Sequence, residues 1–140
     1  MTLSLKYMSG NEKKRAVIDA AMKIAGPSTD KEFKVFGHGN PKIIMSDNGP
    51  LDAEKLAADI LNSPEYIGGK QKVILYACRT GKEPDGLAQQ LSNILGVVVD
   101  APNTEIWIKK SGGFLIGDIT RVGNRYHIDK GKMIGFNPEI

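Results

Sequence analysis

The sequence contains a single cysteine, Cys78, among its 140 residues. One cysteine excludes an internal disulfide and any zinc site built from several cysteines. We therefore expect Cys78 to be a free thiol, which suits a reducing compartment such as the cytoplasm.

Long apolar runs and a strong charge excess are also lacking. No apolar stretch approaches the roughly 20 residues that cross a bilayer, so we predict no membrane span. The N-terminal segment MTLSLKYMSGNEKKR has no long apolar region followed by a small-residue cleavage site, so we predict no signal peptide. The formal charge is only +3 and the basic residues are mostly scattered, which indicates solvated faces and no nucleic-acid partner.

Motifs for phosphate and metal chemistry are incomplete. Lys82 follows Gly81, but no glycine stands at position 76 and no serine or threonine follows the lysine, so a phosphate-binding loop is excluded. A phosphatase loop would need an arginine six positions after Cys78, where Pro84 stands. Histidines and carboxylates show no metal-ligand spacing. We predict neither a metal nor a cofactor.

The pattern of apolar residues predicts a single α/β domain over residues 1–140. Alternating or continuously apolar segments predict strands at 3–8, 32–36, 42–47, 73–77 and 97–99. Apolar residues at helical spacing predict helices between them, which begin at a Ser9–Glu12 capping box, at the N-cap Asp52 and near Leu87, and end at Gly26, Ser63 and Gly96. Residues 105–109, 113–119 and 125–130 alternate and predict antiparallel hairpins. The order implies a mostly parallel sheet with a C-terminal β-hairpin extension.

Two reactive side chains follow strands of this predicted sheet. His38 comes after the strand 32–36, within a turn predicted at 37–41, and Cys78 directly follows the strand 73–77. Open α/β sheets bind ligands at the carboxyl ends of their strands. If the two strands are neighbours, about 5 Å apart, an imidazole and a thiol open onto one crevice. The imidazole can then accept the proton of a thiol nucleophile and donate it again during the reaction.

Glycines on both sides of His38 fit this hypothesis, because Gly37 and Gly39 let a substrate backbone approach closely. The backbone N–H groups of Gly39 and Cys78 could together form an oxyanion hole. A catalytic cysteine would have a low-pKa thiol that reacts fast near neutral pH. The alternative is a buried structural thiol and a histidine that serves only the turn, and spacing alone leaves both interpretations open.

The segments Phe33–Gly39 and Val73–Cys78, separated by about forty residues, resemble the His-Gly and Ala-Cys motifs of caspase-like, clan CD cysteine peptidases. The resemblance covers about residues 31–80. It implies a three-layer αβα sheet, Cys78 as nucleophile, His38 as general acid and base, and the N–H groups of Gly39 and Cys78 as oxyanion donors. It also implies that the first specificity pocket lies near the cysteine strand and the next strand, where Arg79, Thr80, Asp100 and Asn103 stand in this sequence. Asp100 would suit a basic substrate residue.

The segments Cys78–Gly81, Leu87–Leu91 and Leu95–Val97 also look like parts of C-terminal domains of bacterial polymorphic toxins, a resemblance that covers about residues 36–108. That resemblance implies an effector module of a larger secreted protein, which acts in a reducing cytoplasm on a protein or peptide substrate and has a cognate immunity or inhibitor protein. Two alternatives stay open. One is a toxin of another catalytic type, such as a nuclease or a deamidase, and the other is a non-catalytic protein-binding module on the same fold.

Overall fold

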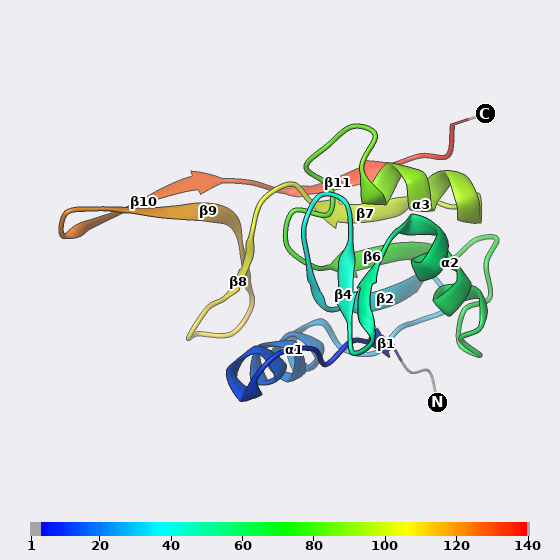
Figure 1. The fold of residues 1–140 in the computed structure, drawn as a ribbon, viewed down its shortest axis with the longest axis horizontal. Coiled ribbons are helices and arrows are strands. Elements are labelled where there is room, and N and C mark those ends of the chain that lie inside the picture. Colours follow the sequence, from blue (N-terminus) through cyan, green and yellow to red (C-terminus); the bar gives the residue numbers. More distant parts are fainter. Residues whose placement is uncertain (1–3, 140) are drawn as a thin grey trace.

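A five-stranded sheet forms the centre of the protein in the computed structural model, which describes residues 4–139 (Figure 1). The strand order is β1-β2-β6-β7-β11, in which the first four strands run parallel and β11 runs antiparallel to β7. The strands are β1 (Leu5–Lys6), β2 (Glu32–Phe36), β6 (Lys72–Tyr76), β7 (Val99–Pro102) and β11 (Met133–Phe136). The predicted α/β class with a mostly parallel sheet is therefore confirmed.

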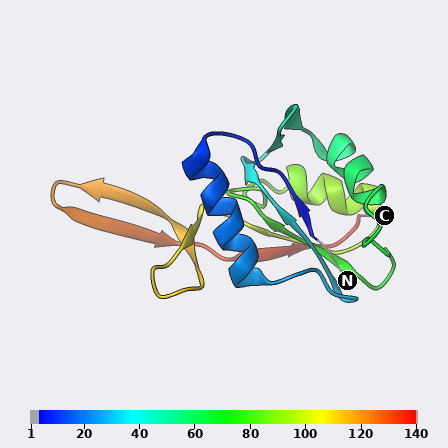
Figure 2. The ribbon, with the colours of Figure 1, turned by 90° about the horizontal axis from the view of Figure 1, so that it is seen from below.

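Three helices connect the parallel strands: α1 (Glu12–Ala25), α2 (Ala53–Leu61) and α3 (Leu87–Leu95). Side chains alternate between the two faces of a strand, so each sheet face meets different helices. α2 and α3 pack with Phe33 and Val35 of β2, whereas α1 packs with Phe36 of the same strand. Figure 2 shows α1 lying across the strands on the face turned to the viewer. No helix within residues 4–139 has the length and apolar character needed to cross a membrane.

Two small antiparallel sheets extend the central one. The first contains β3 (His38–Gly39), β4 (Ile44–Ser46) and β5 (Gly49–Leu51), and the second contains β8 (Ile106–Ile108), β9 (Phe114–Val122) and β10 (Arg125–Lys130). The second sheet confirms the predicted C-terminal hairpins. Its β9–β10 hairpin projects away from the rest of the protein (Figures 1 and 2).

Local signals placed most helix ends correctly. The Asp52 carboxylate accepts a hydrogen bond from the Lys55 N–H at 2.9 Å, as expected of an N-cap, and Gly26 and Gly96 cap α1 and α3 with positive φ angles of 77° and 70°. The prediction that a Ser9–Glu12 capping box begins α1 was wrong. Asn11 is the N-cap of α1, because its side chain accepts from the Lys14 N–H at 3.0 Å.

Strand boundaries were less predictable. The strand 32–36 is confirmed to the residue, but the turn predicted at 37–41 begins as β3, in which His38 pairs with Met45. The bounds predicted for the strand at 97–99 were wrong, since β7 starts at Val99 and continues through Asp100 to Pro102. It continues because β11, which the sequence did not indicate, pairs with all four of its residues. Of the strand predicted at 3–8, Leu5 and Lys6 form β1, and Leu3 lies outside the described residues.

Leu75, in the middle of β6, has no solvent exposure and lies in the main core cluster. We expect Leu75→Ala to lower the free energy of unfolding by about 2–5 kcal/mol, because it removes buried apolar contacts and leaves a cavity. The control is Ile94→Ala in α3, whose side chain is 46% exposed and which should cost less than about 1 kcal/mol. Urea unfolding measures both values, and equal losses would contradict this packing.

Candidate functional site

The pairing of β2 with β6 brings His38 and Cys78 to one edge of the sheet. The two strands are parallel neighbours in a register that matches Phe36 with Tyr76. The Gly37 N–H continues the pairing by donating to the Tyr76 carbonyl at 3.3 Å. His38 and Cys78 follow at once, so both side chains leave the sheet at its carboxyl edge, where open α/β sheets bind ligands.

Both side chains line the same two cavities beside this edge. The first is mostly apolar and is lined by residues of α1, β6, β8 and β9 together with the dyad: Val17, Ile18, Ala21, Gly37, His38, Tyr76, Cys78, Ile106, Ile108 and Phe114. The second adjoins it, has a volume of about 370 Å³, and adds Glu105 and Trp107 to the lining. A ligand in this region would therefore meet the imidazole, the thiol and an apolar wall together.

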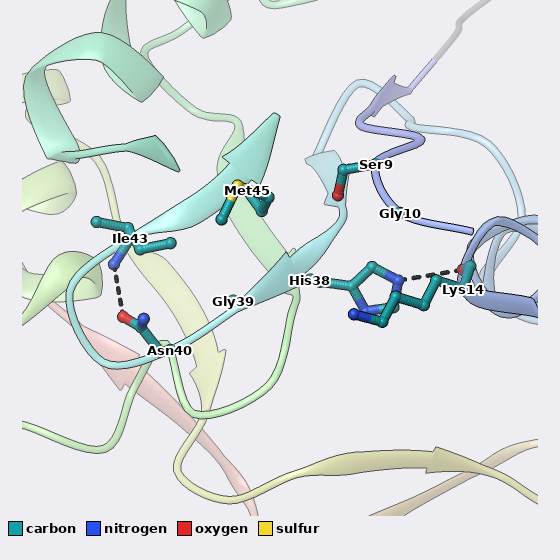
Figure 3. Close-up of a pocket in the computed structure, with 8 residues that line it drawn as sticks. All are labelled: Ser9, Gly10, Lys14, His38, Gly39, Asn40, Ile43 and Met45. Carbon is teal, nitrogen blue, oxygen red and sulfur yellow. Dashed lines mark hydrogen bonds between the residues drawn. The ribbon is translucent and has the colours of Figure 1, made fainter. Parts of the chain in front are cut away.

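The imidazole of His38 is held by the first turn of α1. Its Nε2 lies 3.1 Å from the backbone carbonyl oxygen of Lys14, a contact drawn in Figure 3. A carbonyl oxygen can only accept a hydrogen bond, so Nε2 carries the proton in this contact. In the neutral ring Nδ1 is then unprotonated and can accept a proton.

The thiol of Cys78 is held by the backbone of β8. Its Sγ accepts from the Ile106 N–H at 3.5 Å and faces the Ile106 carbonyl oxygen at 3.9 Å. Burial raises the pKa of the thiol, and the negative charge of Glu105 raises it further, against the lowering effects of the Ile106 N–H and the positive charge of Arg79. This direction is opposite to that of the low-pKa thiol expected of a catalytic cysteine. At neutral pH the sulfur is protonated and needs a base before it can act as a nucleophile.

Gly39 lies directly against the residues that flank Cys78. A Cβ at this position would stand 2.9 Å from Cγ2 of Thr80 and 3.2 Å from Cβ of Ala77, so a larger residue does not fit without displacement. The Asn40 N–H donates to the Ile43 carbonyl across the β3–β4 turn. Because hydrogen-bonded pairs alternate along an antiparallel ladder, the Gly39 N–H points away from β4. This direction is compatible with its expected role as an oxyanion donor.

The four residues expected to bind substrate line neither of the two cavities. Arg79, with a φ of 57°, forms ion pairs with Glu105 at 3.2 Å and Asp118 at 3.1 Å. Thr80 is fully buried, and its hydroxyl donates to the Ala77 carbonyl, so it is not available to a ligand.

Asp100 and Asn103 are likewise engaged elsewhere. The carboxylate of Asp100 lies 2.6 Å from the ammonium of Lys72, the first residue of β6, and therefore at the end of that strand opposite Cys78. The side chain of Asn103 accepts from the Lys132 N–H at 2.8 Å and so fixes the segment that leads into β11. The expectation that Asp100 recognises a basic substrate residue is therefore corrected.

Several lining residues were not foreseen from the sequence. The carbonyl of Lys14 and the side chains of Val17, Ile106 and Phe114 come from segments distant in sequence from both motifs. The sequence placed Val17 on the apolar stripe of α1 and so did not distinguish it from core residues, whereas the structure leaves its side chain 47% exposed. No local pattern indicates that β8 and β9 would fold over β6.

A further hollow opens on the other side of His38 (Figure 3). It is lined by the loop before α1, by the first turn of α1 and by the β3–β4 hairpin: Ser9, Gly10, Lys14, His38, Gly39, Asn40, Ile43 and Met45. An extended ligand that passes His38 could thus contact the protein on both sides of the imidazole. Within residues 4–139, no group of three or more His, Cys, Asp or Glu side chains gathers closely enough to hold a metal ion.

Comparison with known proteins identifies a family. Residues 3–116 match the family described as Domain of unknown function (DUF8616), which is more than half of the chain. The chain belongs to this family. The match includes His38, Cys78 and the whole of β8, whereas β10 and β11 lie beyond it. No curated protein and no solved structure matched the chain.

Replacing Glu105 with glutamine removes one of the influences that raise the pKa of Cys78. A lower pKa increases the thiolate fraction near neutral pH, so we expect Glu105→Gln to be alkylated faster by iodoacetamide than the wild type. Intact-mass measurement of alkylation against pH gives the rates. Glu54→Gln, in the exposed first turn of α2, is the control and should match the wild type. Unchanged or slower alkylation of Glu105→Gln would contradict the assignment.

Proposed function

We propose that the protein is a cysteine peptidase in which Cys78 is the nucleophile and His38 is the general acid and base. One observation carries the proposal. The hydrogen bond from Nε2 of His38 to the Lys14 carbonyl fixes the ring so that Nδ1 is the nitrogen left to accept a proton, and the Cys78 thiol lines the same cavities. Thiol catalysis needs a nucleophile, a base and a group that orients the base, and these roles would fall to Cys78, His38 and the Lys14 carbonyl.

The raised pKa of Cys78 decides how the reaction would begin. Because the thiol is protonated, Nδ1 of His38 takes its proton as sulfur attacks the substrate carbonyl carbon. The resulting oxyanion would accept hydrogen bonds from the N–H groups of Gly39 and Cys78. The C–N bond then breaks, and the imidazolium gives its proton to the leaving amine. Water, deprotonated by His38, then attacks the thioester carbonyl carbon, the C–S bond breaks to release the acid, and the imidazolium returns its proton to the sulfur.

Within residues 4–139, no hydrogen bond joins the imidazole of His38 to the thiol of Cys78, and each is bonded to a backbone group instead. Catalytic hydrogen bonds are often long in the free enzyme and shorten when substrate binds. The proposal therefore includes a small adjustment of the Cys78 side chain away from Ile106 and towards Nδ1 of His38.

The lining of the cavities indicates the substrate class. The wall beside the dyad is formed by Val17, Tyr76, Ile106, Ile108 and Phe114, so it favours a peptide with an apolar side chain next to the cleaved bond. This replaces the basic side chain that Asp100 would have selected.

The arrangement of helices supports the caspase-like part of the proposal. α1 packs on one face of the sheet and α2 and α3 on the other, as a three-layer αβα domain requires. We extend the proposal to the biological setting that the sequence resembles, a bacterial effector or toxin module with a cognate immunity protein. The unpaired Cys78 thiol fits a reducing site of action.

A second candidate function is a non-catalytic protein-binding module. It is favoured by the two contacts of Cys78 with the backbone of Ile106 and by the raised pKa of the thiol, both of which suit a structural cysteine. In that case Cys78 and Arg79 would serve to fix β8 and β9 on the sheet.

Digestion of a mixed synthetic peptide library, with mass spectrometry of the products, tests the proposal. We expect cleavage by the wild type under reducing conditions, none by Cys78→Ala, and a rate about 10²–10⁴-fold lower for His38→Ala, since it loses general acid–base catalysis. Ser111→Ala, a similarly small change in the exposed β8–β9 turn, should cleave at the wild-type rate.

Products that persist in Cys78→Ala would contradict the peptidase assignment. A wild type that cleaves no peptide, with Cys78 alkylated equally slowly in wild type and His38→Ala, would favour the binding module. Nuclease activity that survives Cys78→Ala would favour a toxin of another type.

A further inference from the structure

The projecting β9–β10 hairpin presents an unpaired sheet edge. β10 is the outer strand of its sheet, and every one of its residues is exposed. Large apolar side chains are exposed along the hairpin, with Val122 69% and Tyr126 68% accessible. Open edges of this kind readily pair with another strand. We propose that two copies of the chain pair antiparallel along β10, which joins their three-stranded sheets into one.

The ladder shows which backbone groups face the open edge. The Gly131 N–H donates to the Ile116 carbonyl at 2.9 Å, which extends the β9–β10 ladder by one pair beyond Lys130 and Gly117. Hydrogen-bonded pairs alternate along such a ladder, so Arg125, His127 and Asp129 direct their N–H and C=O groups towards β9. The residues between them, Tyr126 and Ile128, direct theirs outward.

To form hydrogen bonds with Tyr126 and Ile128, a second β10 must place opposite them the residues whose own backbone N–H and C=O groups point away from β9. When the pairing is centred on His127, Tyr126 lies opposite Ile128 of the second copy, and Arg125 lies opposite Asp129 of the second copy. The two-fold symmetry repeats each pair, giving two apolar pairs and two pairs of opposite charge, with His127 opposite its own copy at the centre. Both kinds of cross-strand pair stabilise a sheet.

Two neighbouring registers also allow backbone hydrogen bonds between the two β10 strands, but their opposed side chains are less complementary. Centring on Tyr126 places Arg125 opposite His127 twice and Asp129 opposite Gly123, so it leaves no pair of opposite charge. Centring on Ile128 places Tyr126 opposite Lys130, leaves Ile128 with itself as the one apolar pair, and pairs Asp129 only with His127, which is charged only when protonated. The register on His127 is therefore the one that the sequence of β10 favours.

The charges within the hairpin give an independent reason for the second copy. Asp129 lies directly opposite Asp118, and like charges in that position destabilise a sheet. Asp118 is neutralised by Arg79 at 3.1 Å, whereas the partner of Asp129 is His127 at 2.9 Å, which is charged only when protonated. Arg125 of the second copy would supply Asp129 with a permanent positive charge.

Sedimentation velocity of the full chain over a range of concentrations tests the proposal. We expect a dimer that dissociates on dilution. Arg125→Asp and Asp129→Arg each turn both attractive charge pairs into repulsive ones, so each variant alone should self-associate at least about tenfold more weakly. Lys110→Asp, a matched charge change in the exposed β8–β9 turn, should dimerise like the wild type. Circular dichroism confirms that each variant is folded.

Mixing the two variants gives the decisive result. In a mixed pair, the aspartate introduced at position 125 of one chain faces the arginine introduced at position 129 of the other, and the unchanged Asp129 faces the unchanged Arg125. Both charge pairs are then attractive again, so the equimolar mixture should form a heterodimer. Recovery of dimer in the mixture supports the proposed register.

Several results would overturn the proposal. They are a wild type that remains monomeric up to about 1 mM, single variants that dimerise like the wild type, and a mixture that stays monomeric. A monomer whose β10 binds a different protein would also overturn it.

Discussion

The parallel pairing of β2 with β6 is the constraint on which the site depends. The register from Glu32–Lys72 to Phe36–Tyr76 ends both strands at the same level, so the residues that follow them leave the sheet side by side. Gly39 then lies against Ala77 and Thr80, where a Cβ would have no room. A one-residue slip of this pairing would turn the side chains to opposite faces and separate His38 from Cys78.

The second sheet closes the site and at the same time sets the chemistry of the thiol. The ion pairs of Arg79 with Glu105 and Asp118 fix β8 and β9 beside Cys78, and β8 supplies the backbone contacts of its sulfur. This closure buries the thiol and raises its pKa. With its pKa raised, the Cys78 thiol stays protonated near neutral pH. In the proposed peptidase mechanism it would depend on the imidazole of His38, whose tautomer is set by the hydrogen bond from Nε2 to the Lys14 carbonyl.

Sequence signals were sufficient where the structure is local. The alternating strand pattern Glu32–Phe36, the N-cap Asp52 and the terminal Gly96 each act within a few residues, and each was placed correctly. The failures depend on contacts distant in sequence. Asp100 was expected at a strand end because nothing local indicates that β11 pairs with β7 and prolongs it, and the same holds for the position of β8 over Cys78. The neighbouring positions of His38 and Cys78 could be predicted because parallel strands that flank one crossover tend to be adjacent.

The protonation state of His38 tests the central claim most directly. The chain has two histidines, so a His127→Asn variant leaves a single imidazole for long-range proton–nitrogen NMR. For the neutral ring the account predicts a proton on Nε2 and a bare Nδ1, with both nitrogen resonances shifted when Cys78 is alkylated. A proton on Nδ1 with a bare Nε2, or resonances that do not respond to alkylation, would contradict it.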